Sequence, residues 1–306
     1  MPRFLTTLFL RSPIGRYGDR LWEANETDAH MQLSKLQKLV VTLYLVVRDS
    51  EAGKFPPRPA DTIEEAHARE REYLDRLAGV SRKEMDRLGL QKPFWGGRDM
   101  QRLLQDFCRT DRIFRSAGLE PPARLLELGC GSGWFAELFA RCGYDVLGTT
   151  LDPQTVSLAQ RRARAFDTLG KDGSLSYTTA AMEELSTTLQ GEKPFDAAFM
   201  YEALHHVHDW RQSLTECAKV LRPGGKLLIA NEPNLIHTIK SYRVAQLTGT
   251  HEIGMSRPAL IEHLLANGFS DVRIVRHRLA CGLLPIWLLA TRADDAPQSS
   301  STVSSR

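Results

Sequence analysis

Short apolar runs alternate with amphipathic segments along the chain from residue 123 onward. Five of these runs are bounded by turn residues and predict buried strands at 123–129, 144–150, 174–180, 195–201 and 226–232. The segments between them have the periodicity of helices that bury one face. Because such an alternation is typical of parallel strands joined by crossover helices, the pattern predicts an α/β fold.

Two more apolar runs, at 271–277 and 283–291, predict closing strands. Ser256 stands where a helix N-cap is expected and Gly268 where that helix should end, so a helix precedes these strands. Pro285 has no backbone N–H to donate. It is therefore expected at the end of the last strand or at a bulge.

Helix signals dominate the first 121 residues. Apolar periodicity there predicts three helices, over 27–49, 61–77 and 98–117. Residues 50–60 read as a proline-rich linker, Gly118 should end the third helix, and the Pro121-Pro122 pair marks a boundary. We therefore expect a helical extension or lid at 1–121, an α/β domain at 122–292 and a disordered tail at 293–306.

The composition is that of an ordinary globular protein, since 42% of the residues are hydrophobic and 25% are charged. The formal charge of +3 is too small and too dispersed to indicate a nucleic-acid partner. Arg161, Arg162 and Arg164 lie close together without interleaved aromatic residues. They are therefore expected on the solvated face of a helix.

The cysteines and apolar runs bear on the cellular location. Five cysteines are an odd number, and no two of them form a CxxC pair or a zinc-ligand spacing, which predicts a reduced, intracellular protein. The N-terminus lacks the core and cleavage site of a signal peptide. The longest apolar run, Leu39–Val47, is shorter than the ~20 residues of a membrane-spanning helix. A cytoplasmic protein without an integral membrane segment is expected, and peripheral membrane contact stays open.

The most informative segment is the glycine-rich loop after the first predicted strand, ELGCGSG at 127–133. Glycine permits tight turns and lets a ligand lie against bare main chain, while the N-terminus of the next helix offers N–H groups. Trp134 stands where a dinucleotide site requires glycine or alanine, which argues against a nicotinamide or flavin cofactor. The loop therefore indicates a cofactor site of another kind, with a ligand-free turn as the alternative.

The α/β segment resembles the class I S-adenosylmethionine-dependent methyltransferases over about residues 122–291. LLELGCGSGW is similar to the first motif of that family, FDAAFMYEALHHVHD to its fourth-strand segment, and LRPGGKLLIANEP to its loop and fifth strand. The resemblance implies a Rossmann-like three-layer αβα sandwich with a seven-stranded mixed sheet whose last strand is antiparallel. It also implies S-adenosyl-L-methionine as the cofactor.

Carried over by position, the resemblance implies a set of cofactor-binding residues. The three loop glycines would approach the methionyl and adenosyl parts, and Glu127 would bind the methionine ammonium directly or through water. Met182 would lie over the edge of the adenine ring, and the backbone near Tyr201 beside the ammonium. The full expected set is Glu127, Gly129, Cys130, Gly131, Gly133, Thr150, Leu151, Met182, Glu183 and Tyr201.

Two positions depart from the pattern common in the family. Many members end the second strand with a carboxylate that accepts both ribose hydroxyls, where this chain has Thr150; the cyclopropane-fatty-acid-synthase-like branch also has threonine there, so the change does not by itself abolish binding. Where many members have an acidic residue near the adenine amine, this chain has Ala181, and the partner of that amine stays open. Asp152 precedes Pro153, which predicts a helix N-cap, with ribose contact as the alternative.

Histidines follow the fourth strand, at the carboxyl edge where open α/β sheets bind ligands. His205 or His206, without preference, is the expected general base for an acceptor hydroxyl; either could instead pack or hydrogen-bond within the sheet edge. His208 lies nearer the next helix and has a weaker claim. Adjacent ring directions and the lack of a partnering carboxylate pattern predict no metal site.

The N-terminal helices and the segment 234–256 are expected to select the methyl acceptor. The candidate pocket residues are Trp95, Arg98, His237, Tyr242 and His251. Their mixture of aromatic and polar groups suits a small-molecule or glycan-like acceptor but does not identify it. The working hypothesis is O-methylation with a histidine base. The alternatives are a C- or N-methyltransferase, including one for lipid-like acceptors, and a cofactor-binding module without catalysis. A nucleotide-dependent oxidoreductase is disfavoured by Trp134.

Overall fold

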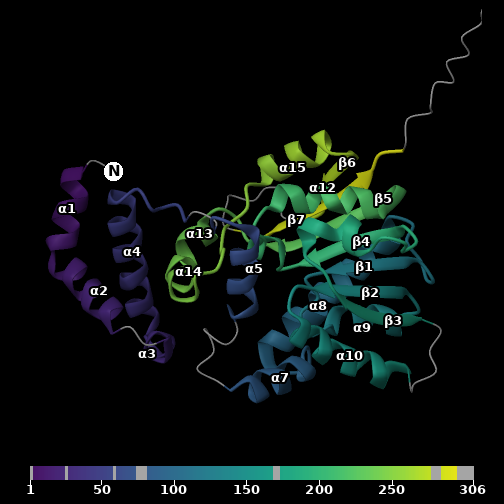
Figure 1. The fold of residues 1–306 in the computed structure, drawn as a ribbon, viewed down its shortest axis with the longest axis horizontal. Coiled ribbons are helices and arrows are strands. Elements are labelled where there is room, and N and C mark those ends of the chain that lie inside the picture. The colour runs from purple at the N-terminus through teal and green to yellow at the C-terminus, as the bar shows by residue number, and fades with distance from the viewer. Residues whose placement is uncertain are drawn as a thin grey trace, which may run out of the picture.

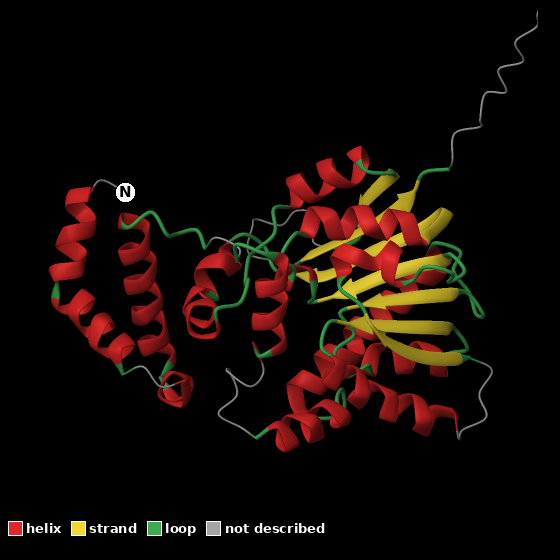
Figure 2. Cartoon of the chain, viewed as in Figure 1, coloured by secondary structure: helices red, strands yellow, loops and turns green. Residues whose placement is uncertain are grey.

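The fold is built around a twisted sheet with helices on both faces, and a group of N-terminal helices extends to one side of it (Figures 1 and 2). The computed structural model describes six stretches of the chain: 3–24, 27–57, 60–73, 81–167, 173–276 and 284–294. Residues 295–306, most of the predicted tail, lie outside these stretches.

Seven strands form the central sheet. They are β1 (Arg124–Leu128), β2 (Asp145–Thr150), β3 (Ser174–Thr179), β4 (Phe195–Tyr201), β5 (Leu221–Glu232), β6 (Phe269–Ile274) and β7 (Ile286–Arg292). Their order is β3-β2-β1-β4-β5-β7-β6. Strands β1 to β5 pair in parallel, whereas β7 pairs antiparallel with both β5 and β6. The predicted mixed sheet with an antiparallel last strand is confirmed.

The strands form where apolar side chains can be buried on both faces of the sheet. Along β4, Ala198 and Met200 join one buried cluster, while Ala197 and Phe199 join the cluster on the opposite face. Pro285 directly precedes β7, in agreement with its expected place at the strand end. Residues 277 and 283, at the ends of the two predicted closing runs, lie outside the described stretches.

Helices cover both faces of the sheet. One face is covered by α8 (Gly97–Ser116), α9 (Trp134–Arg141) and α10 (Pro153–Asp167), and the other by α11 (Leu185–Thr188), α12 (Trp210–Val220) and α15 (Arg257–Ala266). Asp209 and Ser256 accept hydrogen bonds from the first backbone N–H groups of α12 and α15, as the cap signals predict. The remaining short helices are η1 (Met182–Glu184), η2 (Leu204–His206), α13 (Ile236–Lys240) and α14 (Tyr242–Thr248).

The N-terminal part is helical, as predicted, but with more breaks. Its helices are α1 (Arg3–Arg11), α2 (Pro13–Glu23), α3 (Thr27–Gln32), α4 (Lys35–Glu51), α5 (Ile63–Arg71) and α7 (Arg82–Gln91). The helix predicted over 27–49 is two helices, because Ser34 and Gln37 form a reciprocal capping box that begins α4. The helix predicted over 61–77 ends at Arg71 in the structure, and its residues 74–77 lie outside the described stretches.

The prediction for Arg162 is wrong. Its side chain is 8% exposed and donates hydrogen bonds to Glu137 on α9 and to the carbonyl oxygen of Gly89 at the end of α7. A guanidinium has five N–H donors, so several acceptors can compensate its burial. Arg161 and Arg164 are exposed, as predicted. In the described stretches, no helix is both long and apolar enough to cross a membrane.

Candidate active site

A cavity of about 160 Å³ opens at the carboxyl edge of β1 and β2. Helix α5 forms one of its walls with Ala66, His67 and Glu70, which brings the N-terminal part of the chain to the site. Six of the ten expected cofactor residues line it: Gly129, Gly131, Thr150, Leu151, Met182 and Glu183. The N-terminal part therefore supplies one side of this cavity.

The three glycines of the loop differ in how much space surrounds them. All three have positive φ angles, which glycine adopts without strain: 68° at Gly129, 52° at Gly131 and 77° at Gly133. A Cβ at Gly129 would lie 2.6 Å from the Cβ of Ala203, and one at Gly133 would lie 2.5 Å from the ring of Tyr177. A Cβ at Gly131 would meet nothing within 4 Å. Gly131 is therefore where bare backbone faces open space in the cavity.

Glu127 connects β1 to α9 rather than lining the cavity. It is buried, and its carboxylate accepts a hydrogen bond of 2.8 Å from the backbone N–H of Ala136. Burial raises the pKa of Glu127 to about 8, although the Ala136 N–H and the charges of Lys92 and Arg162 oppose the rise. Near pH 7 the free protein therefore holds a largely neutral carboxyl group behind the glycine loop.

Replacing Glu127 with glutamine should stabilise the protein against alkali. The pKa of this carboxyl group is 4.5 in the unfolded chain and about 8 in the folded protein. Between these two pH values, the folded protein keeps a proton that the unfolded chain releases. The stability of the wild type therefore falls as the pH rises through this window, by on the order of a few kcal/mol. Glutamine stays neutral and still offers Ala136 an acceptor. Thermal unfolding from pH 5 to pH 8.5 should show a Glu127→Gln advantage that grows with pH, and a constant difference would contradict the assignment.

Cys130 and Tyr201 do not line the cavity. Cys130 is 3% exposed beneath the loop. The Tyr201 hydroxyl donates to Asp106 at 2.9 Å and accepts from Arg102 at 3.0 Å, and both partners belong to α8. Tyr201 thus fixes α8 against the carboxyl end of β4, and Arg102 reaches onward to Glu202 at 3.1 Å.

Asp152 caps α10, as its position before Pro153 predicts. Its carboxylate accepts hydrogen bonds from the backbone N–H groups of Gln154 at 3.0 Å and Thr155 at 3.1 Å. Arg82 of α7 donates to the same carboxylate at 3.1 Å. Burial raises the pKa of Asp152, but the hydrogen bonds from Thr155 and Arg82 outweigh it and lower this pKa overall. Both carboxylate oxygens are thereby engaged, so the geometry favours the cap over the ribose contact.

A second cavity, of about 570 Å³, adjoins the first. Glu202 and His206 line both cavities, and His205 and His237 line the second. Glu202 is at a positive φ of 51°, unusual for a residue with a side chain, and it accepts a hydrogen bond of 2.6 Å from Asn231. Two cavities with a shared wall can hold two reactants side by side.

A buried carboxylate at the end of β5 fixes the segment that carries the histidines. Glu232 is fully buried, and it accepts hydrogen bonds from the backbone N–H groups of Ala203 at 2.6 Å, Leu204 at 2.8 Å and His205 at 3.2 Å. Its Oε2 also lies 2.8 Å from the Nδ1 of His205. Burial raises the pKa of Glu232, but His205 and the backbone donors outweigh it, so this pKa is lowered overall. An ionised Glu232 therefore orients the imidazole through Nδ1.

His206 is flanked by two carboxylates. Its Nδ1 lies 3.3 Å from Glu70 of α5 and 3.9 Å from Glu252. Burial lowers the pKa of His206, but the charges of Glu70 and Glu252 outweigh it and raise this pKa to about 9. The ring lies against that of His205, with centroids 4.1 Å apart. His206 thus bridges α5 and the wall between the cavities.

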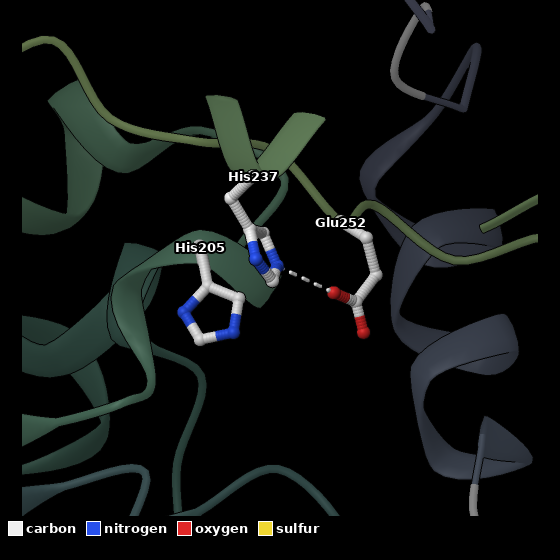
Figure 3. A group of neighbouring side chains, drawn as sticks. All are labelled: His205, His237 and Glu252. Carbon is white, nitrogen blue, oxygen red and sulfur yellow. Dashed lines mark hydrogen bonds and ion pairs between the residues drawn. The ribbon is translucent and has the colours of Figure 1, made fainter. Parts of the chain in front are cut away.

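Figure 3 shows His205, His237 and Glu252 converging from three segments of the chain. The Nε2 of His237 lies 3.1 Å from the Oε2 of Glu252. One candidate ligand atom from each of the three residues lies within 4.8 Å of the other two, a spacing that could hold a metal ion. Burial raises the pKa of Glu252, but the hydrogen bond with His237 and the neighbouring His206 outweigh it and bring this pKa to about 2.

Of the five residues proposed for the acceptor pocket, His237 lines the second cavity. Tyr242 is buried, and its hydroxyl donates to Asp49 at 2.8 Å. Nδ1 of His251 lies 2.6 Å from a backbone carbonyl, and Trp95 donates to the carbonyl of Leu88. Arg98 is exposed on α8.

Sequence reasoning missed the carboxylates around the histidines. Glu232 carries a usable signal, because it ends a buried strand at the ligand-binding edge. Neither Glu70 nor Glu252 could be linked to His206 from the sequence, since Glu70 lies in the helical extension and Glu252 in the segment between β5 and α15. Only the fold brings them within 4 Å of His206.

Residues 126–229, from β1 into β5, match a family model described as a methyltransferase domain. A ubiquinone biosynthesis O-methyltransferase of Xanthomonas campestris pv. campestris (strain B100) is 30% identical over 174 residues, which cover 57% of this chain and 65% of that protein. The chain thus spans less than two thirds of that relative's length. An enzyme of the same name from Sinorhizobium medicae (strain WSM419) is 29% identical over 177 residues, which cover 52% of this chain and 67% of that protein.

A solved structure, an S-adenosylmethionine-dependent methyltransferase of Methanosarcina mazei, is 22% identical to this chain. The match has a TM-score of 0.47 and covers 60% of this chain and 98% of that one.

Proposed function

We propose that this chain, which belongs to the class I S-adenosylmethionine-dependent methyltransferase family, methylates a hydroxyl group of a small-molecule acceptor. The observation that carries the proposal is the pair of adjoining cavities, one at the glycine loop and one at the histidines, with Glu202 and His206 in their common wall. We also propose a cytoplasmic location, because the four cysteines in the described stretches are unpaired.

The residues of the first cavity fit the cofactor of this family. Gly131 offers bare backbone where a Cβ would project into the cavity, and Thr150 and Leu151 follow from the end of β2. Met182 supplies an apolar surface for a flat ring. When bound, S-adenosyl-L-methionine supplies an electrophilic methyl group on a sulfonium.

The chain's own residues would orient the acceptor and take up its proton. Correct orientation of two reactants can supply roughly 7–11 kcal/mol of a barrier, without a covalent enzyme intermediate. His205 receives the proton of the acceptor hydroxyl, because the carboxylates beside His206 raise its pKa to about 9 and keep that imidazole protonated near neutral pH. His205 is the better oriented, because Glu232 holds its Nδ1 at 2.8 Å and leaves Nε2 toward the second cavity.

The names of the relatives favour an oxygen acceptor over carbon or nitrogen. Small molecules with a hydroxyl group, glycans included, are therefore the acceptors to screen first, before lipid-like compounds. A cofactor-binding module without catalysis is the second candidate, and the absence of a carboxylate at Thr150 and Ala181 is the observation that favours it.

The test combines cofactor calorimetry with a screen of hydroxyl-bearing small molecules and glycans for transfer of a labelled methyl group. Once an acceptor is found, His205→Asn should lower turnover by roughly 10²–10⁴-fold, as expected for loss of a general base, with unchanged cofactor affinity. His206→Asn is the companion variant. Normal turnover in both variants would refute the histidine base, and cofactor binding without transfer to any acceptor would favour the module.

A further inference from the structure

We infer that His205, His237 and Glu252 bind one divalent transition-metal ion at the wall of the second cavity. The three side chains converge from η2, α13 and the segment after α14 (Figure 3), and their candidate ligand atoms lie within 4.8 Å of one another. Binding of the ion requires neither cofactor nor acceptor, so the inference goes beyond the proposed methyl transfer.

The spacing is close to that of a coordination sphere. Bonds of about 2.0–2.2 Å to nitrogen and oxygen place the ligands of a tetrahedral ion roughly 3.3 Å apart. The Nε2 of His237 and the Oε2 of Glu252 are already 3.1 Å apart. No two of the ligand atoms are more than 4.8 Å apart, so a movement of roughly 1.5 Å would bring all three to coordination distance of one ion. Rotation of the side chains can supply a movement of that size.

The second nitrogen of His205 has the partner that metal-binding histidines typically have. Such histidines usually hydrogen-bond a carboxylate through the nitrogen that does not bind the metal, which fixes the tautomer and ring orientation. The Nδ1 of His205 lies 2.8 Å from Glu232, which two further backbone N–H groups hold in place. The other ring nitrogen points toward Glu252 in Figure 3.

The three segments are also tied to one another by backbone contacts. The N–H of Ile253 donates to the carbonyl oxygen of His205 at 3.3 Å. The buried hydroxyl of Ser241 lies 2.8 Å from the carbonyl oxygen of His237 and 3.1 Å from that of Glu252. The three ligand residues are therefore already held near one another before an ion binds. Ion binding would require little further ordering of the backbone.

The ligand set indicates the class of ion. Two imidazoles and one carboxylate suit Zn²⁺, Fe²⁺ or Mn²⁺ better than Ca²⁺ or Mg²⁺, which favour oxygen ligands. Three protein ligands leave a position open, and His205 and His237 line the second cavity. An acceptor oxygen bound to the ion would lose its proton to solvent more readily, and the ion would then replace the Nε2 of His205 as the activating group. This role, unlike ion binding, rests on the proposed function.

The test titrates Zn²⁺ into the full chain without an affinity tag and without cofactor, by calorimetry. We expect one equivalent to bind. His237→Gln and Glu252→Gln should each weaken binding by at least 100-fold, and Glu232→Gln by roughly 10–100-fold. His263→Gln on α15, away from both cavities, is the matched control and should bind like the wild type. Co²⁺ in place of Zn²⁺ should give visible absorption bands that Glu252→Gln loses.

Circular dichroism of each variant separates loss of a ligand from loss of the fold. Absence of Zn²⁺ binding by the folded wild type would overturn the site, as would equal affinity of the wild type and both ligand variants. Cofactor affinity is measured on the same samples after chelation. Cofactor binding and methyl transfer without Zn²⁺ binding would overturn the metal site alone, whereas Zn²⁺ binding without methyl transfer would count only against the proposed function.

Discussion

Replacing Gly131 with leucine should reduce the affinity for S-adenosyl-L-methionine by more than 100-fold and leave the protein folded. A Cβ at this position meets nothing within 4 Å, so the added side chain extends into the cavity rather than into the core. The leucine must adopt the left-handed backbone conformation of Gly131, with a φ of 52°, which lowers the free energy of unfolding by about 1–2 kcal/mol. Calorimetry with S-adenosylhomocysteine measures the affinity.

Gly118→Leu is the matched control for that experiment. Gly118 also has a positive φ, 79°, and open surroundings, but it precedes β1 and thus lies at the opposite edge of the sheet from the cavity. Both variants should melt a few degrees below the wild type, and only Gly131→Leu should lose the cofactor. Retained affinity in Gly131→Leu would place the cofactor elsewhere.

The fold was predictable from sequence because its signals are local and repeated. Each strand from β1 to β4 is an apolar run between turn residues and leads into a helix. In β5 the apolar run begins only after Gly225, although the strand itself begins at Leu221. The break before α4 was also readable, since Ser34 and Gln37 have the spacing of a capping box. Continuous apolar periodicity on both sides of Ser34 concealed it.

The site was only partly predictable, and the difference lies in sequence separation. The glycine loop is one turn of backbone, so its geometry follows from adjacent residues. Glu70 and His206, by contrast, meet across 136 positions of the chain because α5 packs over the sheet edge. The prediction for Arg162 was wrong for the same reason. Its acceptor Gly89 lies on α7, a helix that the apolar periodicity of the sequence did not predict. Burial of a charged side chain depends on such distant partners, which a local pattern does not contain.

Removing the buried carboxylate of Glu232 should be the most destabilising single change at the site. Glu232→Ala leaves the N–H groups of Ala203, Leu204 and His205 buried without their acceptor. Breaking a buried, hydrogen-bonded charge pair typically costs about 3–5 kcal/mol. At roughly 2–4 °C per kcal/mol for a domain of this size, the melting temperature should fall by about 10 °C or more.

Glu232→Gln separates the stability of the loop from the orientation of His205. The amide oxygen can still accept from Ala203 and Leu204, so most of the stability should return. The amide NH₂ group, however, then faces the Nδ1 of His205 and its backbone N–H, and it cannot accept from either. We therefore expect Glu232→Gln to stay folded and to lose turnover about as much as His205→Asn.

Glu216→Ala is the control for Glu232, because Glu216 is also a buried carboxylate that accepts a backbone hydrogen bond, from Ser186 at 2.8 Å. It lies on α12, outside both cavities, so its loss should lower the melting temperature and leave turnover per folded molecule unchanged. Thermal unfolding and turnover, measured on Glu232→Ala, Glu232→Gln and Glu216→Ala, separate the role of Glu232 in stabilising the backbone from its role in orienting His205. Full turnover in Glu232→Gln would mean that Glu232 only holds the backbone, and that the direction of the His205 ring does not matter for the reaction.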